Sequence, residues 1–518
     1  MRVTQPLLRN AQQRPNALAT SCAGRRRNWR EFADRVARYA GVLQQQGLAN
    51  GDRVAIVALN SDHYLETFYA VPWAGGIIVP INTRWSQAEI AYALADAGVR
   101  ILVVDEHFTE LAAQLQAVSS LPLDILVLGG VEAANGLDVE KALAATPPVA
   151  EAGRGGDDVS GIFYTGGTTG KSKGVMLSHA NHVTNSLQLA AMMRAPEELS
   201  YLHAAPMFHI ADALCVFMVT TLGGSHHVIP RFEPAACARA LADNRITDIL
   251  LVPTMIQMLL DHLEQQPCAL DALARLYYGA SPIPEATLLR LFDALPTCSP
   301  VQLYGQTEAA PMLTLLEGKY HVKAGPHAGR LRSAGRAIPC IELKIVDTDD
   351  QEVPRGTVGE IVARGPNVMR GYWQMPEQSA QTLRGGWLHT GDAAWMDEEG
   401  FIFISDRLKD MIISGGENVY STEVEQALYQ HPSVAQCAVI GVPDERWGER
   451  VHAVVVPKPG AERDAQALIA HCRALIADFK CPRSIDFQDE PLPLSGAGKI
   501  LKTELRKPYW DGRARSVN

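Results

Sequence analysis

The chain has 518 residues, more than three times the ~150 residues of an average domain, so one large domain and a smaller one are expected. Apolar residues make up 47% of the chain and charged residues 20%, which excludes a disordered or fibrous protein. The formal net charge is −10, and a nucleic-acid-binding role is therefore not expected, because phosphate binding needs a basic surplus.

The cysteine pattern and the apolar segments predict a cytoplasmic protein. Nine cysteines are scattered without a Cys-x-x-Cys pair, which is typical of reduced thiols. The N-terminal residues lack the apolar stretch of a signal peptide, and the chain has no run of about 18 apolar residues. The most apolar segments, 69–81 and 213–222, are too short, and we expect them to be buried strand and helix segments. The basic run 25–27 leaves peripheral contact with a membrane open.

Short β-branched runs alternate with amphipathic segments in the first part of the chain. The runs 54–58, 101–105 and 125–128 predict strands, and the segment 90–98 between the first two predicts a helix. This alternation is typical of an α/β fold with mostly parallel sheets that are covered by helices. A polar, Gly-rich break at 151–158 precedes an apolar strand at 161–165, which leads directly into a Gly/Thr-rich loop.

After about Gly391 the pattern changes to shorter strands and Gly-rich turns. Thr422 and Glu425 have the spacing of a capping box and predict the start of a helix. Strands at 438–442 and 451–456 and a helix near 464–477 would follow. We therefore predict a large N-terminal domain, residues 1–407, of mostly parallel sheets flanked by helices, and a small α+β C-terminal domain, residues 408–518.

The segment 164–179, YTGGTTGKSKGVMLSH, is built to hold phosphate. Glycines let backbone N–H groups turn toward anionic oxygens, threonine hydroxyls add donors, and Lys171 or Lys173 can supply positive charge. A Walker A loop would require glycine at position 165, which is Thr165, so a kinase-like or GTPase-like interpretation loses its main support.

Five segments in order resemble the adenylate-forming superfamily, which includes acyl- and aryl-CoA synthetases. They are YTGGTTGKSKGV at 164–175, YGQTE at 304–308, WLHTGD at 387–392, DRLKDMIISGGENVY at 406–420 and PLSGAGKILKTELR at 493–506. Within that superfamily the chain is most similar to bacterial fatty-acid or related carboxylate CoA ligases. The resemblance implies that ATP, Mg²⁺, CoA and a small carboxylic acid bind, and that the small domain is mobile.

The chemistry implied by the resemblance has two half-reactions. A carboxylate attacks the α-phosphate of ATP, and the thiol of CoA then displaces AMP from the acyl-adenylate. Because the first two reactants are both anionic, a lysine and a metal ion are the expected means of neutralising charge. The implied catalytic residues are Lys499 on the carboxylate and α-phosphate, His209 between acyl pocket and thiol tunnel, and Glu308. For His209 two roles stay open, a gate and an oxyanion partner. Glu308 and Thr168 would ligate Mg²⁺.

The resemblance also implies a set of nucleotide contacts. Asp392 would accept hydrogen bonds from the ribose hydroxyls, with Arg407 as a partner at the ribose or phosphate. Contacts to the β- and γ-phosphates would come from Thr165, Gly166, Gly167, Thr168, Thr169, Gly170 and Lys173. The adenine-binding walls would be Gly279, Ala280, Ser281, Tyr304, Gly305, Gln306 and Thr307. Within this set Tyr304 would stack on the base, and Thr307 would lie near the α-phosphate.

The small domain is expected to rotate between the half-reactions, because pantetheine would collide with the adenylation lysine. The implied hinge is Lys409, and Gly416 would then face the thiol tunnel, where a missing Cβ lets the backbone approach pantetheine. Arg446, Trp447 and Lys480 are candidate CoA contacts, with an ordinary surface role equally open.

Some positions depart from the family pattern. Gly166 replaces a common serine, and Ser172 and Ser421 replace common prolines. Asp212 stands where a small apolar residue is commoner. If Asp212 lines the acyl pocket, it favours an acid with a polar or cationic group; if it pairs with a neighbour, it carries no information about the acid.

The function predicted from the sequence is an ATP-dependent acid:CoA ligase for an aliphatic (fatty) or related acid, with a role in fatty-acid metabolism. Two alternatives stay open, a carrier-protein phosphopantetheine as the acceptor and an aryl or polar-substituted acid as the substrate. The compact spacing between Gly335 and Asp392 favours CoA, since carrier-protein-loading relatives usually carry an insertion. A non-catalytic binder is disfavoured because Lys499, Glu308 and Asp392 are all present. A homodimer is left open.

Overall fold

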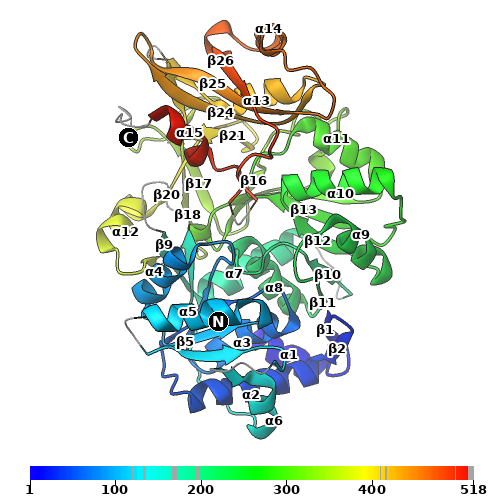
Figure 1. Ribbon diagram of the computed structural model, residues 1–518, viewed down its shortest axis with the longest axis vertical. Coiled ribbons are helices and arrows are strands. Elements are labelled where there is room, and N and C mark those ends of the chain that lie inside the picture. The colour runs from blue at the N-terminus through cyan, green and yellow to red at the C-terminus, as the bar shows by residue number, and fades with distance from the viewer. Residues whose placement is uncertain are drawn as a thin grey trace.

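The computed structural model describes residues 1–119, 122–131, 136–165, 172–193, 198–408, 410–414, 417–495 and 498–510. Four sheets and the helices around them make up this part of the chain, with the C-terminal elements gathered at one end (Figure 1). The two largest sheets are mostly parallel, and the two smaller ones are mostly antiparallel. The predicted α/β fold class is confirmed.

The eight-stranded sheet has the order β19-β9-β8-β4-β3-β5-β6-β7, and β8 to β7 in this order run parallel. Its strands are β3 (Arg53–Val57), β4 (Ile77–Pro80), β5 (Ile101–Val104), β6 (Asp124–Val127), β7 (Leu137–Asp138), β8 (Val159–Thr165), β9 (Lys173–Ser178) and β19 (Gly371–Tyr372). The predicted strands at 54–58, 101–105 and 125–128 are confirmed as β3, β5 and β6.

The nine-stranded sheet has the order β16-β15-β14-β13-β12-β10-β11-β1-β2, with a parallel centre and antiparallel strands at both edges. Its strands are β1 (Leu18–Cys22), β2 (Arg25–Asn28), β10 (Ser200–His203), β11 (Ser225–Val228), β12 (Asp248–Leu251), β13 (Arg275–Gly279), β14 (Ser299–Gly305), β15 (Met312–Leu316) and β16 (Arg336–Ala337). The carboxyl ends of its parallel strands meet at one edge, which is where ligands bind in such sheets.

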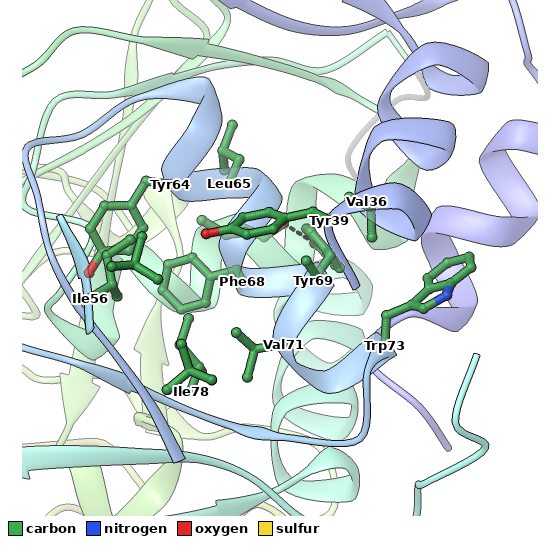
Figure 2. Close-up of a cluster of buried hydrophobic side chains, with 14 of the residues drawn as sticks. Val36, Tyr39, Ile56, Tyr64, Leu65, Phe68, Tyr69, Val71, Trp73 and Ile78 are labelled. Atoms are coloured by element: carbon green, nitrogen blue, oxygen red, sulfur yellow. Dashed lines mark hydrogen bonds between the residues drawn. The ribbon is translucent and has the colours of Figure 1, made fainter. Parts of the chain in front are cut away.

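Helices cover the two large sheets. They are α1 (Gln5–Gln13), α2 (Trp29–Gln45), α3 (Asp62–Trp73), α4 (Gln87–Ala97), α5 (Thr109–Val118), α6 (Val139–Ala145), α7 (His179–Met193), α8 (Ile210–Leu222), α9 (Pro234–Asp243), α10 (Pro253–Gln265) and α11 (Glu285–Ala294). The side chains of Tyr39, Phe68 and Tyr69 from α2 and α3 form part of a fully buried core (Figure 2).

The two apolar segments are buried, as predicted. Residues 69–81 contribute the end of α3 and strand β4, and residues 213–222 lie in α8. Among the described residues, no helix combines the length and the apolar character needed to cross a membrane.

The C-terminal part contains two smaller sheets. The four-stranded antiparallel sheet consists of β17 (Glu342–Val346), β18 (Gly359–Arg364), β20 (Leu388–Met396) and β21 (Ile402–Arg407), and α12 (Pro376–Thr382) lies between β19 and β20 in the chain. The last sheet consists of β22 (Ile412–Ser414), β23 (Glu417–Val419), β24 (Val434–Asp444), β25 (Gly448–Pro457) and β26 (Ser484–Phe487). It packs with α13 (Ser421–Tyr429), α14 (Ala465–Leu475) and α15 (Lys502–Trp510). The predicted strands 438–442 and 451–456 and the helix 464–477 are confirmed as β24, β25 and α14.

The predicted capping box at Thr422 and Glu425 is wrong, although α13 begins within one residue of the predicted position. Glu425 accepts a hydrogen bond from the backbone N–H of Val439 (2.8 Å) and pairs with Lys502 (2.7 Å). The Thr422 hydroxyl donates to the backbone carbonyl of Ser405. Both side chains therefore make tertiary contacts in place of local ones.

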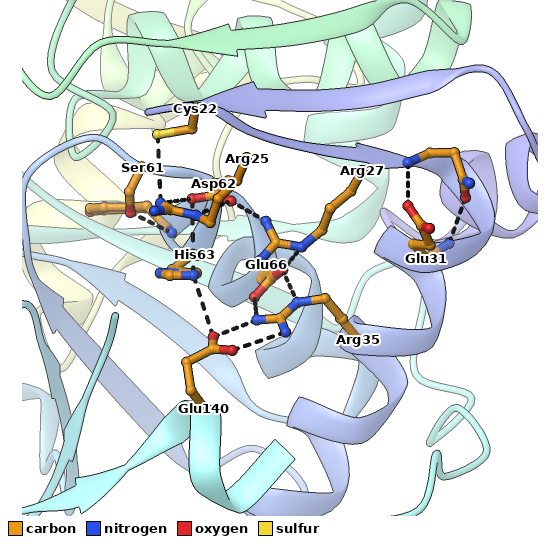
Figure 3. Close-up of polar contacts among 12 residues, drawn as sticks. Cys22, Arg25, Arg27, Glu31, Arg35, Ser61, Asp62, His63, Glu66 and Glu140 are labelled. Carbon is orange, nitrogen blue, oxygen red and sulfur yellow. Dashed lines mark hydrogen bonds and ion pairs between the residues drawn. The ribbon is translucent and has the colours of Figure 1, made fainter. Parts of the chain in front are cut away.

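A buried cluster of charges joins β2, α2, α3 and α6 (Figure 3). Asp62, which is fully buried, pairs with Arg25 and Arg27, and Arg35 bridges the carboxylates of Glu66 and Glu140. Burial alone would raise the pKa of Asp62, but hydrogen bonds from Arg25 and the charges of its neighbours lower it to about 2. Two residues of the basic run 25–27 are therefore held by a carboxylate inside the protein.

Candidate active site

Asp392 lies where the four-stranded sheet meets the carboxyl edge of the nine-stranded sheet. It is 4% exposed and accepts a hydrogen bond from the Tyr304 hydroxyl at the end of β14 (2.8 Å). Asp392 and Arg407 are register partners on β20 and β21, and Arg407 Nε lies 2.9 Å from Asp392 Oδ1. The carboxylate of Asp392 raises the pKa of Arg407, which stays positively charged. The structure thus brings together three residues that the sequence assigns to the nucleotide.

Glu308 lies in a 3₁₀ turn, Thr307–Ala309, that directly follows β14, and it is 8% exposed. The Tyr372 hydroxyl from β19 donates to Glu308 Oε1 (2.8 Å), and Lys173 Nζ lies 4.9 Å from the centre of the Tyr372 ring. Thr165 and Lys173 are register partners at the ends of β8 and β9. Glu308 is therefore close to the two strand ends that enclose the Gly/Thr-rich loop.

Some predicted residues lie outside the described residues. These are Gly166, Gly167, Thr168, Thr169 and Gly170 of the loop, the hinge residue Lys409, and Gly416. Their phosphate contacts, the metal-ligand role of Thr168 and the tunnel contact of Gly416 stay predictions.

The predicted adenine walls come from the ends of two adjacent parallel strands. Gly279 on β13 pairs in register with Leu303 on β14, and a Cβ at Gly279 would lie 2.2 Å from the Leu303 carbonyl oxygen. A Cβ at Gly305 would lie 1.8 Å from the Pro311 carbonyl oxygen. Glycine is required at both positions because the neighbouring backbone fills the space of a side chain. Residues Ala280 and Ser281 follow the first strand end, and Gln306 and Thr307 follow the second.

Lys499 lies in a C-terminal loop that is closed by a bridge between Leu494 and Ile500. The backbone N–H of Lys499 donates to Ser495 Oγ (3.1 Å), and Arg84 from the N-terminal part donates to the Ser495 carbonyl oxygen (3.3 Å). A Cβ at Gly498 would lie 2.9 Å from Val252 Cγ2, next to the start of α10. The loop that carries Lys499 is therefore packed against the N-terminal sheets.

His209 is the N-cap residue of α8, and its Nδ1 accepts a hydrogen bond from the backbone N–H of Ala211 (3.3 Å). Burial lowers the pKa of His209 to about 3, and the nearby positive charge of Lys499 acts in the same direction. The imidazole is therefore neutral at pH 7, and because Nδ1 accepts, the proton is on Nε2. Lys499 and His209 are far apart in the sequence, and in the structure Lys499 is near enough for its charge to act on the His209 imidazole.

Asp212 pairs with its neighbours, which decides between the two alternatives drawn from the sequence. It is fully buried, accepts a hydrogen bond from the Tyr201 hydroxyl (3.1 Å), and lies 2.8 Å from His203 Nδ1. Asp212 therefore does not indicate a polar or cationic acid.

The candidate CoA contacts lie on the small sheet. Lys480 pairs with Glu423 (2.8 Å), and Arg446 lies over the ring of Trp447, which is 46% exposed. The roles of these three residues in binding CoA stay predictions.

Comparisons with known proteins place the whole chain in one family. The family described as "AMP-binding enzyme" matches residues 7–373, and "AMP-binding enzyme C-terminal domain" matches residues 423–499. A feruloyl-CoA synthase from Amycolatopsis sp is 40% identical over 97% of this chain and 98% of its own. A medium/long-chain-fatty-acid–CoA ligase from Mycobacterium tuberculosis is 37% identical over 94% of this chain and 86% of its own.

Solved structures agree over the full length. ATP-bound MatB from Rhodopseudomonas palustris has a TM-score of 0.88 at 32% identity, covering 98% of this chain and 99% of its own. The anthranilate CoA ligase AuaEII in complex with anthranoyl-AMP has a TM-score of 0.91 at 26% identity, covering 98% and 97% of the two chains. The chain therefore belongs to the AMP-binding enzyme family, and it is an acid–thiol ligase of the AMP-forming, acyl-CoA synthetase type.

Proposed function

We propose that this enzyme joins to CoA a carboxylic acid whose tail is apolar and uncharged, with an aromatic acid as the first candidate substrate. The observations that carry the proposal are that the charge of Lys499 acts on the buried His209 ring, and that Tyr304, Glu308 and Asp392 gather around Arg407 at the strand ends. One site thus offers a cation, a neutral hydrogen-bond donor and two carboxylates. These are the groups that two successive acyl-transfer steps require.

In the first step the acid's carboxylate oxygen forms a bond to the α-phosphorus of ATP, and the bond to the leaving pyrophosphate breaks. Lys499 would offset the negative charge that the two anionic reactants bring together. Asp392 would accept hydrogen bonds from the ribose hydroxyls, while Tyr304 and Arg407 hold its carboxylate in place.

Glu308 fits a Mg²⁺ ion because it offers a hard carboxylate oxygen at a buried position, and Tyr372 holds its other oxygen by a hydrogen bond. Bound Mg²⁺ would neutralise charge on the phosphates. Lys173 and the backbone of the loop 165–170 would hold the same phosphates from the other side.

In the second step the CoA sulfur attacks the acyl carbon, the bond from that carbon to the AMP oxygen breaks, and the thiol proton leaves with solvent. Negative charge develops on the acyl oxygen during this attack. His209 would donate its Nε2–H to that oxygen, since the ring is neutral and its Nδ1 is already occupied by Ala211.

The choice of acid rests on the relatives, because a paired Asp212 carries no information about the acid. The relative named as a feruloyl-CoA synthase is 40% identical to this chain, and the relative named as a medium/long-chain-fatty-acid–CoA ligase is 37% identical. An aliphatic acid is the second candidate on the same evidence.

The test is pyrophosphate release from ATP and Mg²⁺ across cinnamic, benzoic, and short-, medium- and long-chain alkyl acids, each with and without CoA. The proposal expects release that depends on both acid and CoA, fastest with an aromatic acid. Fastest release with an alkyl acid would move the substrate to the second candidate. Acid-dependent exchange of pyrophosphate into ATP without CoA-dependent turnover would refute CoA as the acceptor.

A carrier-protein phosphopantetheine is the alternative acceptor. One relative, from Streptomyces coeruleorubidus, is named as a fatty acid–[acyl-carrier-protein] ligase and is 35% identical over 98% of this chain. Acylation of a purified phosphopantetheinylated carrier protein, compared with CoA at equal concentration, separates the two acceptors.

A further inference from the structure

A continuous chain of hydrogen bonds runs beneath helix α8. Asp212 Oδ2 lies 2.8 Å from His203 Nδ1, and His203 Nε2 lies 2.9 Å from His226 Nδ1. His226 Nε2 lies 3.0 Å from the Thr220 hydroxyl, which accepts from the Tyr69 hydroxyl at 2.6 Å. All five side chains are fully buried. The catalytic steps above make no direct use of them.

The donors of this chain all point toward Asp212. Tyr69 donates to Thr220, so the Thr220 hydroxyl can donate to His226, His226 Nδ1–H to His203, and His203 Nδ1–H to Asp212. Burial lowers the pKa of His226 well below its usual range, which keeps that ring neutral as this order requires. Asp212 is thus the final acceptor, and it also accepts from Tyr201.

The chain fixes both ends of α8 to the nine-stranded sheet. Asp212 lies in the first turn of the helix and Thr220 in the last, while His203 and His226 lie on the adjacent strands β10 and β11. The first turn continues directly from His209, whose carbonyl oxygen accepts from the backbone N–H of Asp212 (3.1 Å). Fixing Asp212 therefore fixes the backbone that carries the His209 ring.

The segment before His209 is held from the other side. Asn60, which is 5% exposed, donates from Nδ2 to the Ala205 carbonyl oxygen (2.8 Å) and accepts at Oδ1 from the Met207 N–H (2.9 Å). His209 thus lies between two buried anchors, Asn60 upstream and Asp212 downstream. Displacements of about 1 Å at a reacting group can cost up to a hundredfold in rate, so such anchors bear on catalysis.

We propose that Asp212 is a positioning residue that acts through His209: its hydrogen bonds with His203 and Tyr201 fix the first turn of α8 and so hold the His209 ring at the acyl carbon. This proposal rests on the role of His209 proposed above. It assigns a function to a carboxylate that contacts no substrate.

The test is a double-mutant cycle of Asp212→Ala, His209→Ala and the double variant, read as kcat and KM for thioester formation. Asp212→Ala is expected to lower kcat roughly tenfold with KM for ATP unchanged, because it releases the first turn of α8 without touching the nucleotide. In the His209→Ala background, the same change is expected to have no further effect on kcat. A further tenfold loss in that background overturns the proposal.

Two more variants separate positioning from stability. Thr220→Val breaks the same chain at the far end of α8, and it is expected to lower the melting temperature while kcat of the folded enzyme stays within about twofold. Asp212→Asn keeps an oxygen to accept from His203 and is expected to recover most of the rate. Equal kinetic losses in Thr220→Val and Asp212→Ala, or a loss in Asp212→Asn as large as in Asp212→Ala, would contradict the proposal.

If Asp212→Ala does not fold, Tyr201→Phe replaces it in the cycle, since it removes only one hydroxyl that donates to Asp212. Tyr201→Phe is then expected to lower kcat about threefold, and to have no effect on kcat in the His209→Ala background. An unchanged kcat in the single variant Tyr201→Phe would overturn the proposal. Failure of every acid to give a CoA thioester would refute the proposed function alone. The cycle is then read on acyl transfer from the acyl-adenylate to the phosphopantetheine thiol of a carrier protein, because attack on the same acyl carbon again places negative charge on the acyl oxygen.

Discussion

Lys499→Ala removes a positive charge from a loop that the fold holds against the N-terminal sheets. The Leu494–Ile500 bridge, the bond from Lys499 N–H to Ser495 and the contact of Gly498 with Val252 are all made without the Lys499 side-chain amine. We therefore expect the loop to keep its position when Lys499 is replaced. The change in rate then reports the charge itself.

The size of the effect follows from Coulomb's law. A unit charge about 4 Å from a phosphate oxygen contributes about 4 kcal/mol at an effective dielectric constant of about 20. That energy corresponds to a loss of about a thousandfold in the adenylation rate. Lys499→Arg retains the charge and is expected to retain more of the rate than Lys499→Ala does.

The assay separates the two half-reactions. Adenylation is followed by acid-dependent exchange of pyrophosphate into ATP, and thiol transfer by thioester formation from a supplied acyl-adenylate and CoA. Lys499→Ala should lose the first and largely keep the second, because no phosphate bond is made or broken in the second. Lys507→Ala is a matched control, since Lys507 is 69% exposed and pairs with Glu504 three residues away on the same helix. Equal losses in both half-reactions of Lys499→Ala would refute a role confined to adenylation.

Three further predictions concern the carboxylates. Asp392→Asn should raise KM for ATP about thirtyfold, because two hydrogen bonds from the ribose each lose about 1 kcal/mol when the acceptor is neutral. An unchanged KM in steady-state kinetics would argue against the ribose contact. Chelation by EDTA should stop pyrophosphate exchange until Mg²⁺ is added. Tyr372→Phe should raise the Mg²⁺ concentration needed for half-maximal exchange, because Glu308 loses the hydrogen bond from the Tyr372 hydroxyl. An unshifted Mg²⁺ titration in this variant would count against Glu308 as a metal ligand. The pKa of Asp62 is about 2 in the folded protein, below its reference value of 3.8, so the ionised carboxylate stabilises the folded state above pH 3.8. About 2 kcal/mol of the free energy of unfolding is lost as the pH falls toward 2. Urea unfolding at pH 7 and pH 3 should therefore show a smaller pH dependence in Asp62→Asn than in the unsubstituted chain, and an equal one would exclude Asp62 as the cause.

Local patterns were enough to predict much of the fold. The β-branched runs became β3, β5 and β6, and the two apolar segments that are too short for a membrane are buried in α3, β4 and α8. Helix α14 extends over Ala465–Leu475, inside the range 464–477 that its amphipathic pattern indicates. These elements depend on periodicity within one segment, which the sequence displays directly.

Contacts between distant segments could not be predicted in the same way. The capping box at Thr422 and Glu425 was wrong because Glu425 pairs with Lys502, which is far along the chain. The partners of Asp212 were missed because His203 and His226 become neighbours only when β10 and β11 pair. The sequence held only a weak signal for these contacts. Both histidines lie in short segments whose other residues indicate buried strands, and a polar side chain in a buried strand needs a hydrogen-bond partner.

The hydroxyls of Tyr304 and Tyr372 have a consequence for how the sheets assemble. Tyr304 joins the nine-stranded sheet to Asp392 of the four-stranded sheet, and Tyr372 joins the eight-stranded sheet to Glu308, which follows β14. Both carboxylates reach their bonded positions only after three sheets have come together. A nucleotide held by these carboxylates would bind the assembled form alone, and its binding energy would add to the stability of all three sheets. In that case ATP would stabilise the folded N-terminal part as well as serve as a substrate.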